Sequence, residues 1–308
     1  MDEPRPFAGG ARNTSADATA AGLARDIVPV AVVLLVLLAV WYAATIPMNA
    51  VLTGPKIAAA GGGFANTLAV SWSLDRPVLP APHQVLAGVW TSVFTLDPTT
   101  PRSLVFHAWV TLASTLLGFA MGTGLGIALA IAIVHVKTLQ KSLMPWIIAS
   151  QTVPILAIAP MIIVVLGSIG LTGLVPKSLI SMYLCFFPVT IGMVKGLTSP
   201  EAMQLDLIHT YNAGAAQTLV KLRFPASLPF LFASLKVAIS IALVGAIVGE
   251  LPTGAQAGIG ARLLTASYYG QTIQIWAALV VAALMAAGLV WAVGLAERIT
   301  NRLMGARP

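Results

Sequence analysis

Residue types that commonly carry out chemistry are scattered in this sequence. His107, His135 and His209 lie near the ends of apolar segments and lack the short spacings typical of metal ligands. No set of serine, histidine and aspartate suited to nucleophilic catalysis is apparent. There is also no Gly-x-x-x-x-Gly-Lys-Ser/Thr sequence, whose backbone amides would cradle phosphates. The sequence therefore predicts no catalytic residue, no metal site and no cofactor bound by this chain.

The stretch with the most varied polar chemistry runs from Glu201 to Phe230, between apolar segments. Its pattern predicts a helix, a turn at Asn212-Ala213-Gly214, a second short helix and a stop at Pro225. Asn and Gly tolerate the left-handed backbone of a turn. Such a stretch either presents a surface to another protein or is a solvated connector. The candidate contact residues are Asp206, Tyr211, Asn212, Gly214, Gln217, Leu219, Leu222 and Pro225, with the two leucines as apolar anchors.

A second group of polar residues lies beside prolines inside an apolar segment. Ser150, Gln151 and Thr152 precede Pro154, and Pro160 follows. Prolines remove backbone hydrogen bonds, so a helix here should be broken or bent. Irregular backbone at membrane depth is tolerated where it is buried in protein or lines a cavity. These five residues are therefore candidates for a translocation pathway, although hydrogen bonds between helices explain the polar ones equally well.

Glu250 is the sixth pathway candidate and lies at the end of an apolar segment. A carboxylate there could serve a gate or meet an external protein. It could equally be a solvated residue, because charges near helix ends cost much less than charges at the bilayer centre. Both readings stay open from the sequence.

Composition shows which elements must position these residues. The chain has 308 residues, of which 58% are hydrophobic and 9% charged, and its mean hydropathy is +0.90. Soluble domains usually have about 25% charged residues. The sequence therefore predicts an all-α integral membrane protein with about six transmembrane helices. Loop charges that set topology explain the net charge of +7 better than nucleic-acid binding does.

The apolar segments divide the chain into a tail, a first helix, an external segment and a core. We expect a disordered tail at 1–26, a first transmembrane helix at 27–45 and an external segment at 46–103, with a short amphipathic helix from about His83 to Phe94. A core at 104–297 would hold five further spans, and 298–308 would be a second tail. The expected core spans are 105–134, 143–167, 178–194, one within 228–249, and 273–296.

Glycines and basic residues add expectations about packing and orientation. Gly118, Gly122 and Gly126 would let another helix approach closely, most simply within the same subunit. With the N-terminus inside, one side of the membrane receives 12 of the 17 Lys and Arg residues and the other receives 5. The positive-inside rule places the richer side in the cytoplasm. Both termini and the Glu201 stretch are therefore predicted to be cytoplasmic.

These features together resemble the permease subunit of bacterial binding-protein-dependent ABC importers, of the nitrate/sulfonate/taurine type. The resemblance covers about two-thirds of the chain. In the family's cytoplasmic signature, Pro225 aligns with the terminal proline and Asn212 with the central glycine, while Asp206-Leu207-Ile208 replaces Glu-Ala-Ala. Further matches are Leu79-Pro80-Ala81-Pro82, Pro154, Pro160, Phe186-Phe187-Pro188, Gly196-Leu197 and Val248-Gly249-Glu250.

The resemblance implies a mechanism and a set of partners. Two permease subunits, expected as a homodimer in the inner membrane, would form a pathway for a small polar solute. An external binding protein would deliver a pyrimidine-like or vitamin-precursor heterocycle, or a sulfonate- or nitrate-type anion. Two cytoplasmic ATPase subunits would bind ATP and Mg²⁺, and the loop from Asp206 to Leu222 would dock on them as a coupling helix.

A secondary transporter without an ATPase is the alternative. Broken helices also suit that class, but ion coupling requires ionisable residues inside the spans. The sequence shows essentially none near the span centres, and Lys236 is placed where its long side chain can reach the interface.

Overall fold

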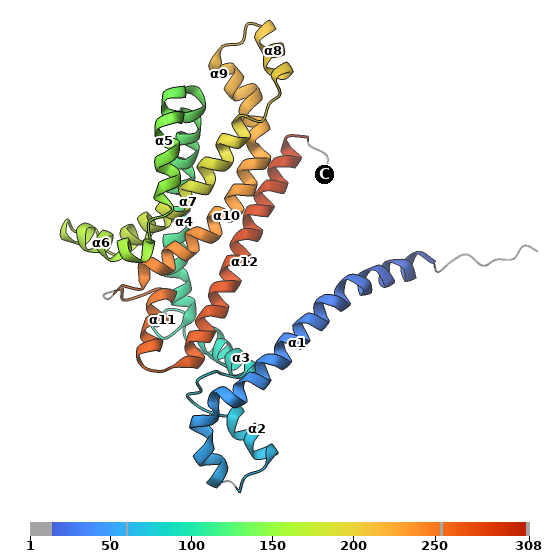
Figure 1. Cartoon of the computed structure of the whole chain (residues 1–308), viewed down its shortest axis with the longest axis vertical. Coiled ribbons are helices and arrows are strands. Elements are labelled where there is room, and N and C mark those ends of the chain that lie inside the picture. Colours follow the sequence, from blue (N-terminus) through green and yellow to red (C-terminus); the bar gives the residue numbers. More distant parts are fainter. Residues whose placement is uncertain (1–13, 60, 253–254, 306–308) are drawn as a thin grey trace, which may run out of the picture. The chain divides into compact units, whose positions relative to one another are not determined.

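The computed structural model describes residues 14–59, 61–252 and 255–305 (Figure 1). The chain divides into two compact units, with the boundary after residue 84. The elements are α1 (Thr14–Ala59), α2 (Phe64–Trp72), α3 (Pro82–Trp90), η1 (Thr91–Thr95), α4 (Leu104–His135), α5 (Lys137–Ser150), α6 (Ile155–Ser168), α7 (Leu174–Leu197), α8 (Ala202–Thr210), α9 (Ala215–Thr218), η2 (Leu219–Arg223), α10 (Phe224–Glu250), α11 (Ile259–Tyr268) and α12 (Thr272–Leu303).

The first unit is built on α1, which is longer than the expected span. It begins at Thr14, inside the tail predicted to be disordered, and it ends at Ala59, inside the predicted external segment. Its first turns are rich in alanine, the residue with the highest helix propensity. Residues 1–13 of the predicted tail lie outside the described part of the chain.

Polar side chains on the second half of α1 hold the segment that follows α2. The Asn49 amide accepts hydrogen bonds from the backbone N–H groups of Val78 and Leu79 and donates one to the Leu79 carbonyl. The Trp72 indole donates to the Thr45 hydroxyl. The expected helix after His83 is present as α3 and the π-helical turn η1.

The second unit is organised around α4, α7 and α10, which lie side by side (Figure 1). A Cβ added at Gly118 would lie 2.3 Å from Ser181 Cβ, and one added at Gly122 would lie 2.2 Å from Cys185 Sγ. The glycine spacing on α4 therefore lets α7 approach within one subunit, as expected. The later glycine on α4 meets the later residue on α7, so the two helices run parallel.

Close packing also joins α7 to α10, in the antiparallel direction. Gly196 of α7 lies against Ser227 near the start of α10, and Gly249 near the end of α10 lies against Lys177 near the start of α7. On its other side, α10 is tied to α12 by an ion pair between Lys236 and Glu297. Lys236 thus has a specific partner inside the protein, which the sequence did not indicate.

The predicted span at 143–167, the third along the chain, is two helices. α5 and α6 meet at a break of four residues and are bent by 98°. Pro154 precedes α6 directly, as the proline pattern predicts. Among the described residues, five helices are long and apolar enough to cross a membrane, and the bent pair raises this number to six if it forms one span. The fold is thus all-helical with the expected number of spans.

Candidate functional site

The first candidate site is the segment from Glu201 to Arg223, which we call the α8–α9 segment. It projects from the end of the bundle where α7 ends and α10 begins (Figure 1). The side chain of Gln204 accepts a hydrogen bond from the Glu201 backbone N–H and so caps α8. The side chain of Gln217 accepts one from the Gly214 N–H and caps α9 in the same way. Both short helices therefore have ordered starts.

The turn between α8 and α9 depends on Asn212. This residue has φ of 54° and is the one non-glycine residue with positive φ among those described. The N–H of Ala213 reaches back to the carbonyl of Ile208, as in a Schellman-type helix end. Gly214 does not use the left-handed backbone that glycine tolerates, because its φ is −71° and its ψ is 169°.

An exposed apolar stripe runs along α8 as far as its C-cap residue, Tyr211. Met203, Leu207 and Tyr211 recur every four residues and are 74%, 59% and 79% exposed. Residues four apart share a helix face, so the three side chains form one strip. Asp206 is also exposed beside it. Large apolar side chains clustered in the open suit contact with another protein.

The two expected apolar anchors of the loop are both only partly exposed. Leu219 packs against the core cluster of α4, α7 and α10, which leaves only part of its side chain free for another protein. Pro225 does not stop the helix: it lies in the first turn of α10, where a missing N–H is tolerated, and helical structure runs from Ala215 to Glu250.

The α8–α9 segment is connected to the bundle through Arg223. Its guanidinium donates a hydrogen bond of 3.1 Å to the carbonyl of Leu197, the last residue of α7. Arg223 ends the π-helical turn η2, which leads directly into α10. Movement of the segment would therefore be passed to both α7 and α10.

The second candidate site is the break between α5 and α6. The Ser150 carbonyl accepts a hydrogen bond from the Tyr183 hydroxyl of α7. The Ser150 and Thr152 hydroxyls bond to carbonyls three residues earlier, while Gln151 and Thr152 remain exposed. Pro154 caps the start of α6 and Pro160 lies within it. Backbone carbonyl groups near the break thus accept hydrogen bonds, partly from nearby side chains and partly from α7.

Glu250 lies in a third place, and it is fully buried, so the reading of a solvated residue is wrong. The Thr111 hydroxyl on α4 lies 3.0 and 2.9 Å from its two carboxylate oxygens, and the Gly260 N–H donates to Oε2 at 3.0 Å. The ammonium of Lys177 on α7 lies 3.7 Å from Oε1. A buried carboxylate needs such donors and a counter-charge. None of its described contacts comes from Ser150, Gln151 or Thr152.

The network around Glu250 continues to the start of α11. The Ile259 N–H donates to the Thr111 hydroxyl at 2.8 Å, and the Gly258 N–H donates to His107 Nδ1 at 3.1 Å. Since His107 Nδ1 is an acceptor, its proton is assigned to Nε2, which lies 2.9 Å from the Pro101 carbonyl. Four helices, α4, α7, α10 and α11, are joined at this one point.

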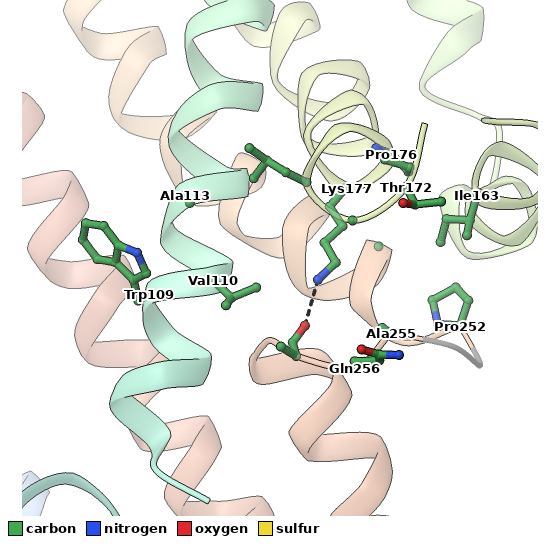
Figure 2. A pocket seen from close by; sticks show the side chains of 14 residues that line it. Trp109, Val110, Ala113, Ile163, Thr172, Pro176, Lys177, Pro252, Ala255 and Gln256 are labelled. Atoms are coloured by element: carbon green, nitrogen blue, oxygen red, sulfur yellow. Dashed lines mark hydrogen bonds between the residues drawn. The ribbon is translucent and has the colours of Figure 1, made fainter. Parts of the chain in front are cut away.

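A cavity of about 630 Å³ lies next to this network. α4, α6, the start of α7 and residues after α10 form its walls. Figure 2 shows Lys177 extending from α7 toward the chain after α10, where its ammonium donates to the Ala257 carbonyl at 2.8 Å. Lining side chains that face the space are Val110, Ala113, Ile163, Thr172, Lys177 and Gln256.

Comparison with known proteins identifies the family. The family described as binding-protein-dependent transport system inner membrane component matches residues 122–305. This chain belongs to that family. A riboflavin transport system permease protein of Chloroflexus aurantiacus is 32% identical over 225 residues, which cover 73% of this chain and 80% of the relative. A probable ABC transporter permease protein of Haemophilus influenzae is 30% identical over 214 residues, 64% of this chain and 85% of the relative.

A third relative is named for a different substrate. A formylaminopyrimidine transport permease protein of Halalkalibacterium halodurans is 30% identical over 198 residues, 64% of this chain and 76% of the relative. The protein is thus the permease subunit of a binding-protein-dependent ABC importer and a multi-pass protein of the inner membrane. Its partners include an ATPase and a substrate-binding protein. A secondary transporter is not favoured.

Several residues of the permease's sites were missed in the sequence. Met203 and Leu207 were not proposed as contacts, although their spacing with Tyr211 at four-residue intervals was a readable signal. Thr111, Lys177 and Gly258 could not be found in this way, since nothing local links them to Glu250. Only the fold brings them together.

Proposed function

We propose that the α8–α9 segment is the coupling element of this permease and docks on the cytoplasmic ATPase. The single observation that carries the proposal is the exposed stripe of Met203, Leu207 and Tyr211 on α8. It is open to solvent and is too apolar for a simple solvated connector. Asp206 adds a charged contact, and the capped turn at Asn212 fixes the shape of the surface.

Coupling requires that force on the segment reaches the transmembrane helices. Arg223 holds the end of α7, and η2 continues into α10. When ATP closes the ATPase dimer, the docked segment moves as a lever and shifts α7 and α10 together. The helices packed on them through glycine contacts then change the opening of the pathway.

The proposal also includes the remaining parts of the assembly. Two copies of the permease, as a homodimer, pair with two ATPase subunits, and the chain's N- and C-termini lie in the cytoplasm. ATP and Mg²⁺ bind in the ATPase. This chain itself binds no cofactor and catalyses no reaction.

The pathway passes the break between α5 and α6 and the region of Glu250. Ser150, Gln151, Thr152, Pro154 and Pro160 shape the break, where exposed polar side chains suit contact with a polar solute. The solute is a pyrimidine-like or vitamin-precursor heterocycle, or a sulfonate- or nitrate-type anion. Relatives are named as permeases for riboflavin, formylaminopyrimidine and, putatively, aliphatic sulfonates, which supports these two substrate classes.

Copurification of the ATPase tests the docking surface. A tagged permease with Leu207→Glu or Asp206→Arg should reach the membrane at the normal level but retain much less ATPase. A charge introduced into an apolar contact, or placed opposite a like charge, costs several kcal/mol, on the order of 2–5. Phe64→Glu on α2, which is 76% exposed outside this segment, is the matched control and should retain the ATPase. Unchanged retention by both α8 variants would make the segment a plain connector.

A further inference from the structure

The cavity beside Lys177 has the size and lining of a ligand pocket. Its volume of about 630 Å³ is within the range of about 300–1,000 Å³ usual for sites that hold small molecules. Val110, Ala113 and Ile163 supply apolar walls. Thr172, Lys177 and Gln256 supply a few polar groups. Such a combination buries an apolar ring and fixes its orientation with a small number of hydrogen bonds.

Lys177 has hydrogen-bonding capacity left for a ligand. An ammonium group carries three N–H donors. One is directed to the Ala257 carbonyl at 2.8 Å and a second faces Glu250 Oε1 at 3.7 Å. No further acceptor of this ammonium occurs among the described residues. The third donor is therefore available to an acceptor atom of a ligand in the cavity. Figure 2 shows the Lys177 side chain next to this cavity.

The charge balance of the cavity decides which ligand fits. The positive charge of Lys177 is already compensated by the fully buried carboxylate of Glu250. His107 contributes no positive charge in this network, because its Nδ1 accepts a hydrogen bond from Gly258. An anion that enters an apolar cavity loses its hydration and needs a free counter-charge. The pair offers none, so the cavity disfavours an anion.

We propose that this cavity is a substrate subsite and that it takes an uncharged heterocycle instead of a sulfonate or nitrate. The ring would lie against the apolar walls, its carbonyl or ring-nitrogen acceptors would meet Lys177, and the Gln256 amide would pair with its donors. This assignment rests on the proposed function, because it names the substrate class of the same transporter.

Direct binding to the purified permease–ATPase complex tests the charge argument without the binding protein. Equilibrium dialysis would use three uncharged probes, cytosine, uracil and riboflavin, and one anion, methanesulfonate. At least one uncharged probe should bind about tenfold or more tightly than methanesulfonate, since an uncompensated anion is costly to bury. Binding of methanesulfonate in preference to all three uncharged probes, or no binding of any of the three, overturns the proposal.

Two neighbouring residues of α6 locate the site. Ile163→Trp fills the cavity, while Val164→Trp places the same ring on a side chain that is 71% exposed and does not line the cavity. The first variant should weaken binding of the uncharged probe by about tenfold or more, and the second should leave it unchanged. Equal effects of both variants would show that the probe binds elsewhere.

Glu250→Gln tests the role of the charge pair. The amide keeps the size of the side chain and leaves Lys177 without its counter-charge, so the preference for the uncharged probe should shrink by about tenfold. A preference unchanged by the substitution contradicts the proposal. ATPase copurification separates this inference from the proposed function: if the ATPase is lost from the wild-type permease, the proposed coupling fails, whereas retained ATPase with no binding preference defeats only the subsite.

Discussion

The backbone of Gly258 lies directly against the carboxylate of Glu250. A Cβ added at Gly258 would lie 2.1 Å from Glu250 Cδ and 2.3 Å from each carboxylate oxygen. The same glycine has φ of 124° and donates its N–H to His107. Only a residue without a side chain fits both the conformation and the space. The start of α11 can therefore close over the Glu250 network and bury it.

Gly258→Ala should destabilise this end of the bundle. An alanine at this position must adopt φ of 124° and ψ of 163°, a region that essentially only glycine occupies and that costs other residues about 1–3 kcal/mol. Its methyl group also overlaps a carboxylate that is held on several sides. We expect a loss of at least about 2 kcal/mol and a clear drop in the melting temperature of the detergent-purified permease. Gly170→Ala is the control, because Gly170 also has a positive φ, of 83°, but has open space around it. Equal melting temperatures of the two variants would show that the contact with the Glu250 carboxylate is unimportant.

Gly122→Ala should weaken the contact between α4 and α7. Its Cβ would meet Cys185 Sγ at 2.2 Å and the Met182 carbonyl at 3.0 Å, so the helices must separate. Overpacking of this kind costs about 1–3 kcal/mol. Gly124→Ala, two residues along the same helix, meets nothing within 4 Å and should be neutral or slightly stabilising. Thermal denaturation of the two purified variants compares them, and equal melting temperatures would refute close packing at Gly122.

The charge bias predicts the orientation of the permease. Lys221 should be cytoplasmic and Arg76 external, because the predicted layout places 12 of the 17 basic residues on the side of Lys221. Single cysteines at these two exposed positions should react with a membrane-impermeant thiol reagent from opposite sides of the membrane. Cys185 is fully buried, so the wild-type protein serves as the unlabelled background. Reaction of both cysteines from the same side would overturn the layout.

The sequence predicted what depends on local signals. The apolar runs located the spans because the length of a run shows whether it can cross a bilayer. Pro154 located the break between α5 and α6 because a proline interrupts the hydrogen bonds of the backbone next to it. Burial of Glu250 could not be predicted, since its partner Thr111 is 139 residues away. The same holds for Lys236, whose partner Glu297 lies on another helix. Leu219 looked like an exposed anchor because helical spacing does not reveal which face packs on the core.

The last prediction concerns the turn of the α8–α9 segment, for which we propose the coupling role. Asn212 has φ of 54°, which asparagine tolerates and valine strongly disfavours. Asn212→Val should therefore distort the turn between α8 and α9, at a cost of about 1–2 kcal/mol. The stripe of Met203, Leu207 and Tyr211 would then lose its fixed relation to Arg223. Because the change lies outside the spans, we expect normal membrane levels, weaker ATPase association and reduced ATP-driven uptake in proteoliposomes.

Two other substitutions show whether the backbone conformation is the cause. Asn212→Gly keeps access to positive φ and should preserve uptake. Gly214→Val should also preserve most of it, because Gly214 has φ of −71° and nothing within 4 Å of its missing Cβ. Loss of uptake in Gly214→Val but not in Asn212→Val would mean that the turn works in a different conformation. Full uptake in all three variants would show that the geometry of this turn does not transmit the motion of the ATPase.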